Sequence, residues 1–138
     1  MDSLTGTEFQ GEGLLWAYDN QEWCIGIKNY KPQNGLEKLE FLERHLETDE
    51  SFFQMAGVAC LLVREADGSF RATLMKPGAL YTVPKNLWHT TITKPGVKLL
   101  LVERSGTNME NSELLNLDRE TRKKAAEAVL ATGFGQID

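Results

Sequence analysis

Residues 43–57 of this chain read ERHLETDESFFQMAG, and residues 78–89 read GALYTVPKNLWH. These two stretches hold the only histidines among the 138 residues, His45 in the first and His89 in the second. A short polar stretch and then an apolar run follow His45, whereas His89 follows a Pro-Lys-Asn turn and begins another apolar run. Both histidines are therefore expected on or beside short β-strands.

Acidic residues accompany the first histidine. Side chains alternate between the two faces of a strand, so Glu43 and His45 point the same way. Glu50 follows the short polar stretch and can return to that face. Two imidazoles and one or two carboxylates that converge inside a barrel form a site for a first-row divalent metal ion. The pattern therefore predicts a divalent metal site that holds His45, His89 and one or both of Glu43 and Glu50.

Short apolar runs separated by turn residues recur along most of the chain. This rhythm favours a sandwich or a barrel over alternating β-α units, so the expected fold class is all-β. Asp67-Gly68 between two apolar runs predicts a hairpin. The expected strands cover residues 14–18, 23–29, 39–46, 52–64, 69–75, 80–83, 89–93 and 97–103.

Two runs, residues 59–63 and 99–102, are apolar at every position. Such strands are covered on both faces, by the barrel interior on one side and by another element on the other. The C-terminal segment predicts one such cover. Asp118 can cap a helix that runs to about Thr132, with Gly133 as its stop.

Length and composition are those of one globular domain, with a barrel core at about 13–104 and a helix at about 118–132. A net charge of −5 and scattered basic residues argue against a nucleic-acid binder. The N-terminus shows no secretory signal, and no apolar run approaches the roughly 20 residues that a membrane span needs. We therefore expect a cytoplasmic protein that binds neither nucleic acid nor membrane.

The two cysteines, Cys24 and Cys60, lie inside apolar runs and show no paired spacing. We expect two reduced, buried thiols. A disulfide and a thiolate metal ligand are the alternatives.

The spacing of the two histidine stretches resembles that of the cupin superfamily, whose barrels carry two short motifs. The first motif runs His-x-His, three or four residues, Glu, six residues, Gly, and His45, Glu50 and Gly57 match its second half. The second motif runs Gly, five residues, Pro-x-Gly, two residues, His, three residues, Asn, and Gly78 and His89 stand at those positions. The resemblance covers about residues 36–104, most of the presumed barrel, and implies a double-stranded β-helix, or jelly-roll barrel.

The chain departs from the cupin motifs at three positions. Glu43 stands where the family has its first histidine ligand, and Thr93 replaces the terminal asparagine of the second motif. Asn86 replaces the turn glycine, and asparagine tolerates positive φ better than other non-glycine residues, so the turn is expected to survive.

The resemblance implies one divalent metal ion, Mn, Fe, Ni or Zn, held by His45, Glu50 and His89. Glu43 is a fourth ligand, a general base beside a three-ligand metal, or a carboxylate at the barrel mouth. A second carboxylate raises the negative charge of the site, which favours a harder metal and disfavours anionic substrates. The alternative is that the two histidines are core residues satisfied by hydrogen bonds, or a surface pair.

Four further residues are expected to line the pocket. Phe52 and Gln54 share the face of Glu50, and Tyr81 and Thr91 are similar candidates. A buried polar group without a partner costs roughly 1–3 kcal/mol, so a pocket ligand or water would satisfy Gln54.

The function that the resemblance implies is a small metal-dependent enzyme acting on a carbonyl or hydroxy-carboxylate metabolite, as a lyase, isomerase or hydrolase. Dioxygenase chemistry also suits two histidines and a carboxylate around iron. The strings Glu43-Arg44-His45 and Trp88-His89 are similar to those of the ureidoglycolate lyase branch. Arg44 points away from His45 and is expected at the surface or between subunits, whereas in the lyase branch it would meet a substrate carboxylate. Trp88 is expected to pack on the face opposite His89. The rivals are a non-catalytic module that binds a small ligand and a structural barrel without metal. Analogy with small cupins further implies a homodimer.

Overall fold

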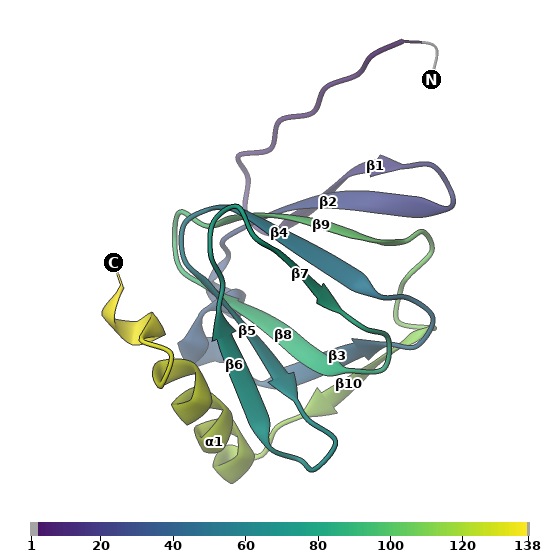
Figure 1. Cartoon of the computed structure of the whole chain (residues 1–138). Helices are drawn as coiled ribbons and strands as arrows, with labels where there is room; N and C mark the ends of the chain where they lie inside the picture. Colours follow the sequence, from purple (N-terminus) through teal and green to yellow (C-terminus); the bar gives the residue numbers. More distant parts are fainter. Residues whose placement is uncertain (1–2, 138) are drawn as a thin grey trace.

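The structure is a computed structural model that describes residues 3–137. Ten strands form two five-stranded sheets that face each other, and one helix lies outside the lower sheet (Figure 1). The first sheet has the order β1-β2-β9-β4-β7, and the second has the order β10-β3-β8-β5-β6. The strands are β1 (Leu14–Asp19), β2 (Trp23–Asn29), β3 (Phe41–His45), β4 (Glu50–Ala56), β5 (Ala59–Arg64), β6 (Phe70–Leu74), β7 (Leu80–Val83), β8 (Trp88–Thr93), β9 (Lys98–Arg104) and β10 (Ser112–Asn116).

All strand pairs are antiparallel, and from β2 onward the chain changes sheet at every connection except the β5–β6 hairpin. This winding is that of a jelly-roll barrel, so the expected all-β fold class is confirmed. The hairpin turns at the predicted Asp67-Gly68, where Gly68 has φ +87°. Asn86 adopts φ +71°, as expected for a residue that replaces a turn glycine.

Two strand predictions are wrong by more than one residue in their bounds, and one strand was not predicted. Residues 52–64 form two strands in different sheets, because the chain turns at Gly57, which has φ +79°. The strand expected from residue 39 begins at Phe41, because Leu36–Lys38 forms a 3-10 turn after a first such turn at Pro32–Asn34. Strand β10 was not expected at all, since its sequence SELLN has neither a long apolar run nor a clear alternation.

Two apolar layers hold the fold together. One fills the barrel between the sheets and includes Phe52, Leu61 and Leu99. The other lies between the second sheet and the C-terminal segment and includes Leu62 and Val129. Strand β5 contributes alternate residues to both layers, so the prediction that residues 59–63 are covered on both faces is confirmed.

The cover on the second layer is helix α1 (Arg119–Leu130), which packs on β5 and β6 (Figure 1). Asp118 is the predicted N-cap, and its side chain accepts a hydrogen bond of 2.8 Å from the backbone N–H of Thr121. The helix ends slightly earlier than expected, and Gly133 has the left-handed φ of +90° that follows many helix ends.

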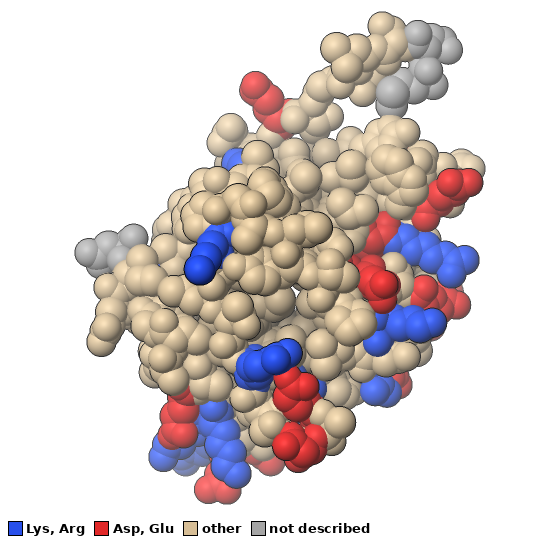
Figure 2. Space-filling model, in the orientation of Figure 1, with Lys and Arg blue, Asp and Glu red and all other residues tan. Residues whose placement is uncertain are grey.

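The outer face of the first sheet has no such cover among residues 3–137. Leu100 and Val102 of β9 are only partly buried, so the expectation that residues 99–102 are covered on both faces is wrong. Neighbouring strands place apolar side chains beside them, including Phe53 and Leu80, of which Leu80 is 65% exposed. Much of the upper and middle surface in Figure 2 is uncharged, and the charged side chains gather towards its lower and right-hand edges.

Both cysteines are free and buried, as expected. Burial raises the pKa of each thiol to about 11, so neither presents a ready thiolate at neutral pH. Within the described residues, no helix has the length and apolar character needed to cross a membrane.

Gly57 is required where the chain passes from β4 to β5. A Cβ at this position would lie 2.5 Å from the backbone Cα of Val97 and 2.7 Å from the carbonyl oxygen of Gly96. Gly78 has a similar φ of +86°, but a Cβ there would meet no atom within 4 Å. Comparing alanine substitutions at the two positions therefore distinguishes the cost of backbone strain from the cost of steric overlap.

We predict that Gly57→Ala is the more destabilising of the two substitutions. Gly78→Ala should cost roughly 1–2 kcal/mol through the left-handed conformation alone. Gly57→Ala should add roughly 1–3 kcal/mol of overpacking against backbone that cannot rotate away. Urea unfolding of both variants measures the difference, and equal losses would contradict the role given to the Val97 backbone.

Candidate metal centre

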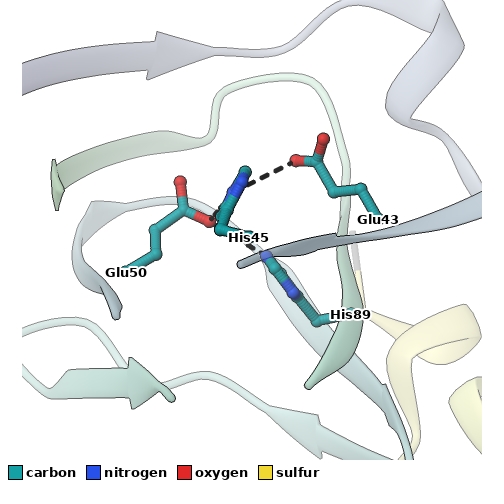
Figure 3. A group of neighbouring side chains, drawn as sticks. All are labelled: Glu43, His45, Glu50 and His89. Carbon is teal, nitrogen blue, oxygen red and sulfur yellow. Dashed lines mark hydrogen bonds and ion pairs between the residues drawn. The ribbon is translucent and has the colours of Figure 1, made fainter. Parts of the chain in front are cut away.

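Strands β3, β4 and β8 bring the four predicted residues together inside the barrel (Figure 3). Glu43 and His45 share the inner face of β3, as the alternation predicted, and Glu43 is the register partner of His89 on β8. Glu50 begins β4 after the chain reverses direction. One donor atom from each of the four residues lies within 4.8 Å of the others, so the cluster could hold a metal ion.

The hydrogen-bond geometry of His89 calls for a proton or a metal ion between its Nε2 and Glu50. Its Nδ1 lies 2.9 Å from the carbonyl oxygen of Leu87, which only accepts, so Nδ1 carries the proton. A neutral ring then presents the lone pair of Nε2, and Nε2 lies 2.9 Å from the carboxylate oxygen of Glu50. Two acceptors at this distance repel each other unless a second proton or a metal ion lies between them.

His45 is also held by a hydrogen bond at Nδ1, the ring nitrogen that points away from Glu50. Its Nδ1 pairs with the hydroxyl of Ser112 at 2.8 Å, and its Nε2 lies 3.3 Å from Glu50 and 3.8 Å from Glu43. Such a bond on the outer nitrogen orients an imidazole for metal binding. Ser112 belongs to β10, so the strand that sequence analysis missed supplies this support.

A third carboxylate, Glu103 on β9, completes the cluster. It is buried, and its Oε2 lies 3.6 Å from Nε2 of His45 without a hydrogen-bond partner among the described residues. Sequence analysis missed it, although Leu99, Leu101 and Glu103 alternate inward along one strand. A period of two along the strand indicates that Glu103 faces inward, but it does not indicate that Glu103 meets His45.

The pKa values of the carboxylates in the cluster are set by burial, hydrogen bonds and neighbouring charges. Burial acts to raise the pKa of Glu50, but the hydrogen bonds from His45 and His89 outweigh it and the pKa is lowered. Burial raises the pKa of Glu103, and the charge of Glu50 adds to this effect.

The pKa of His45 shows the same balance. Burial acts to lower it, but the hydrogen bond to Glu50 and the surrounding carboxylate charges outweigh burial, and the pKa is raised. The cluster therefore favours added positive charge, as a divalent cation supplies, and its nitrogen and oxygen donors suit Mn, Fe, Ni or Zn.

A cavity of about 260 Å³ reaches the cluster and is lined by Glu43, Glu50 and His89. Phe52 and Thr91 line it too, where sequence analysis placed them. Glu43 lies nearest to solvent, with 40% of its side chain exposed, against 7% for Glu50 and 2% for His89.

Gln54 and Tyr81 do not line this cavity, contrary to expectation. Gln54 is fully buried, and its side-chain N–H donates to the carbonyl of Gly57 at 2.6 Å. The hydroxyl of Tyr81 accepts from the backbone N–H of Lys76 at 2.9 Å. Both side chains bond to the backbone of loops next to β4 and β7, and the side-chain oxygen of Gln54 has no hydrogen-bond partner among the described residues.

Arg44 and Trp88 lie on the outside of the second sheet, on the face opposite the histidines. The Arg44 guanidinium lies 4.4 Å from the centre of the Trp88 ring and pairs with Glu113 at 2.5 Å. Trp88 therefore packs where it was expected. Arg44 is engaged by these two neighbours and does not line the cavity, so it is not placed to meet a substrate carboxylate there.

Lys28 is a further cavity residue that sequence analysis missed. It lies on the inward face of β2 with Cys24 and Gly26, and its Nζ donates to the hydroxyl of Thr91 at 2.8 Å. Burial lowers the pKa of Lys28, against the opposing effect of the Glu50 and Glu43 charges.

No protein-family model matches this chain, and no curated protein matches its sequence. Solved structures do match its fold. A cupin-2 domain-containing protein from Shewanella frigidimarina NCIMB 400 is 20% identical with a TM-score of 0.54, over 70% of this chain and 84% of that one. Oxalate decarboxylase from Bacillus subtilis is also 20% identical with a TM-score of 0.53, over 69% of this chain and 24% of that one. The nucleoside dehydratase Pac13 from Streptomyces is 10% identical with a TM-score of 0.57, over 82% of this chain and 87% of that one.

We predict that Ala at His45, Glu50 or His89 weakens metal binding by more than roughly 100-fold, since even outer-shell changes cost about 10- to 100-fold. Ser112→Ala is the matched outer-shell variant and should fall within that smaller range. Competition with a chromophoric chelator for Mn²⁺ and Zn²⁺ measures the affinities, and circular dichroism checks the fold. Histidine variants that unfold while the wild type binds no metal would identify both histidines as core residues.

Proposed function

The chain has the fold of the cupin superfamily, and on that premise we propose that it is a small metal-dependent enzyme. The proposed ligands are His45, Glu50 and His89, and the substrate is a small carbonyl or hydroxy-carboxylate molecule. The single observation that carries the proposal is the pairing of His89 Nε2 with the Glu50 carboxylate at 2.9 Å, while Nδ1 is committed to a carbonyl. A bound cation resolves this contact and leaves both residues as ligands.

A divalent ion in this position would supply Lewis-acid polarisation of a substrate carbonyl or hydroxyl oxygen. The chain's own residues supply the rest. The cavity admits a small molecule to the side of the cluster formed by Glu43, Glu50 and His89. Phe52 and Leu101 line the same cavity and exclude water from part of it.

Glu43 is the proposed proton carrier. Its carboxylate lies 3.8 Å from His45 Nε2, looser than the 3.3 Å contact of Glu50, and it is far more exposed. A carboxylate that faces both the cavity and solvent can take a proton from a bound molecule and pass it on. Glu50, held by both histidines, is less free to do so.

The two named enzymes among the structural neighbours, a decarboxylase and a nucleoside dehydratase, indicate that this barrel hosts bond-breaking reactions of small molecules. Among such reactions, we propose ureidoglycolate lyase activity as the first to test, because of the strings Glu43-Arg44-His45 and Trp88-His89. The position of Arg44 outside the cavity weakens this choice. The rival function is a cupin module that binds a small ligand without turnover.

We predict that Glu43→Gln removes activity and keeps the metal. The protein is loaded with Mn²⁺, Fe²⁺, Ni²⁺ or Zn²⁺ and incubated with ureidoglycolate and small hydroxy acids, and glyoxylate, urea and other products are measured. Loss of the proton carrier should lower kcat roughly 10²- to 10⁴-fold, with metal affinity changed less than about tenfold.

Three outcomes contradict parts of this proposal. Metal loss in Glu43→Gln would make Glu43 a ligand. Saturable binding without turnover of any substrate would favour the binding module. Absence of glyoxylate release with every metal would end the lyase assignment and leave the metal site standing.

We also propose that two copies associate through the outer face of the first sheet. The strand register places Leu15, Ile27, Leu100, Phe53 and Leu80 in one continuous row across β1, β2, β9, β4 and β7. Such a row on an uncovered face is typical of an interface. Light scattering after size exclusion should give a dimer for the wild type and a monomer for Phe53→Lys, whereas a monomeric wild type would contradict the proposal.

A further inference from the structure

Lys28 crosses the barrel interior near the metal cluster. It comes from β2 of the first sheet, and its Nζ hydrogen-bonds to Thr91 of β8 in the second sheet. Thr91 follows His89 by two residues, so both point inward from the same strand. Lys28 therefore reaches the wall of the cavity that also carries a proposed metal ligand.

The hydrogen-bonding capacity of this ammonium is not exhausted. A lysine Nζ has three donors, and one of them is used on Thr91. Among residues 3–137, no carboxylate oxygen lies within 4.0 Å of Lys28 Nζ, the limit for an ion pair. Lys28 is half-buried, and a cation in such a position with spare donors is stabilised by an anion that enters the cavity.

The rest of the cavity is also basic outside the metal cluster. Lys28, Lys31 and Lys38 line it, and Glu40 is the single acidic lining residue apart from Glu43 and Glu50. This is contrary to the composition of the chain, which has 15 basic and 20 acidic residues. Sequence analysis expected the extra carboxylate at Glu43 to disfavour anionic substrates, but these lysines supply attraction that it did not foresee.

We propose that Lys28, positioned by Thr91, binds a carboxylate group of the substrate, whose other end carries the oxygen that faces the metal cluster. Only the placement of the substrate oxygen at the metal cluster rests on the proposed function. A carboxylate fits better than a phosphate, because one ammonium and one hydroxyl meet it and no arginine is among the lining residues. The volume of about 260 Å³ suits a molecule of a few carbons.

Calorimetry with a panel of two- to five-carbon carboxylates tests the proposal, with malate and its neutral diamide as the matched pair. Lys28→Met should weaken carboxylate binding roughly 10- to 100-fold, as expected for loss of a charge-assisted hydrogen bond. Lys28→Arg should restore part of it, and Thr91→Val should give a smaller loss. Lys123→Met, at an exposed lysine of helix α1 that does not line the cavity, is the matched control and should change binding less than about threefold.

The metal is measured in parallel so that the two proposals fail separately. Each variant is titrated with Mn²⁺ alone, and Lys28→Met should bind it like the wild type. Melting curves check folding, and Lys28→Met should melt no lower than the wild type, since it removes a half-buried charge and keeps most of the unbranched side chain.

Three results would overturn the role of Lys28: equal binding of malate and its diamide, unchanged carboxylate affinity in Lys28→Met, or no binding by any carboxylate of the panel. Lys28-dependent carboxylate binding by a protein that takes up no metal would support this inference and overturn the proposed function. Metal binding together with a carboxylate affinity that does not depend on Lys28 would support the metal site and overturn this inference.

Discussion

The contact on which the site depends is the pair of hydrogen bonds that Glu50 makes to His45 and His89. A single carboxylate oxygen joins strands β3, β4 and β8 from both sheets at one point inside the barrel. Burying this carboxylate is unfavourable unless positive charge accompanies it. The side chains around it follow from that requirement, because Ser112 and the Leu87 carbonyl hold the outer nitrogens and turn both Nε2 atoms toward Glu50.

The barrel accommodates this buried carboxylate because its strands place polar and apolar side chains on opposite faces. Strand β8 directs His89 and Thr91 into the barrel, whereas Trp88 packs against the outer layer with Arg44. Strand β5 is apolar on both faces and contributes to the hydrophobic core, which the polar side chains of the metal cluster do not. Stability of the fold therefore rests on aliphatic packing, and the polar cluster is free to serve binding.

The parts predicted from sequence are those set by local rules. Glu43 and His45 share a face because they are two residues apart, Asp118 caps its helix, and Asn86 takes a positive φ in place of glycine. Lys28, Glu103 and Ser112 were not found, because they reach the site from strands whose pairing is settled by long-range register. Local periodicity indicates that such a residue faces inward but not which inward residues meet.

Gln54 shows the opposite limit of the same rule. It faces inward as the alternation predicted, yet an inward position is not a position on the cavity. Gln54 bonds instead to two glycines next to β4 and β7, through its side chain to Gly57 and its carbonyl to Gly78. Thr91 and Lys28 do line the cavity. The cavity thus has carboxylates, the His89 imidazole and the Lys28 ammonium among its lining residues, and this opposition of charge would orient a bound molecule that carries both a metal-binding oxygen and a negative group.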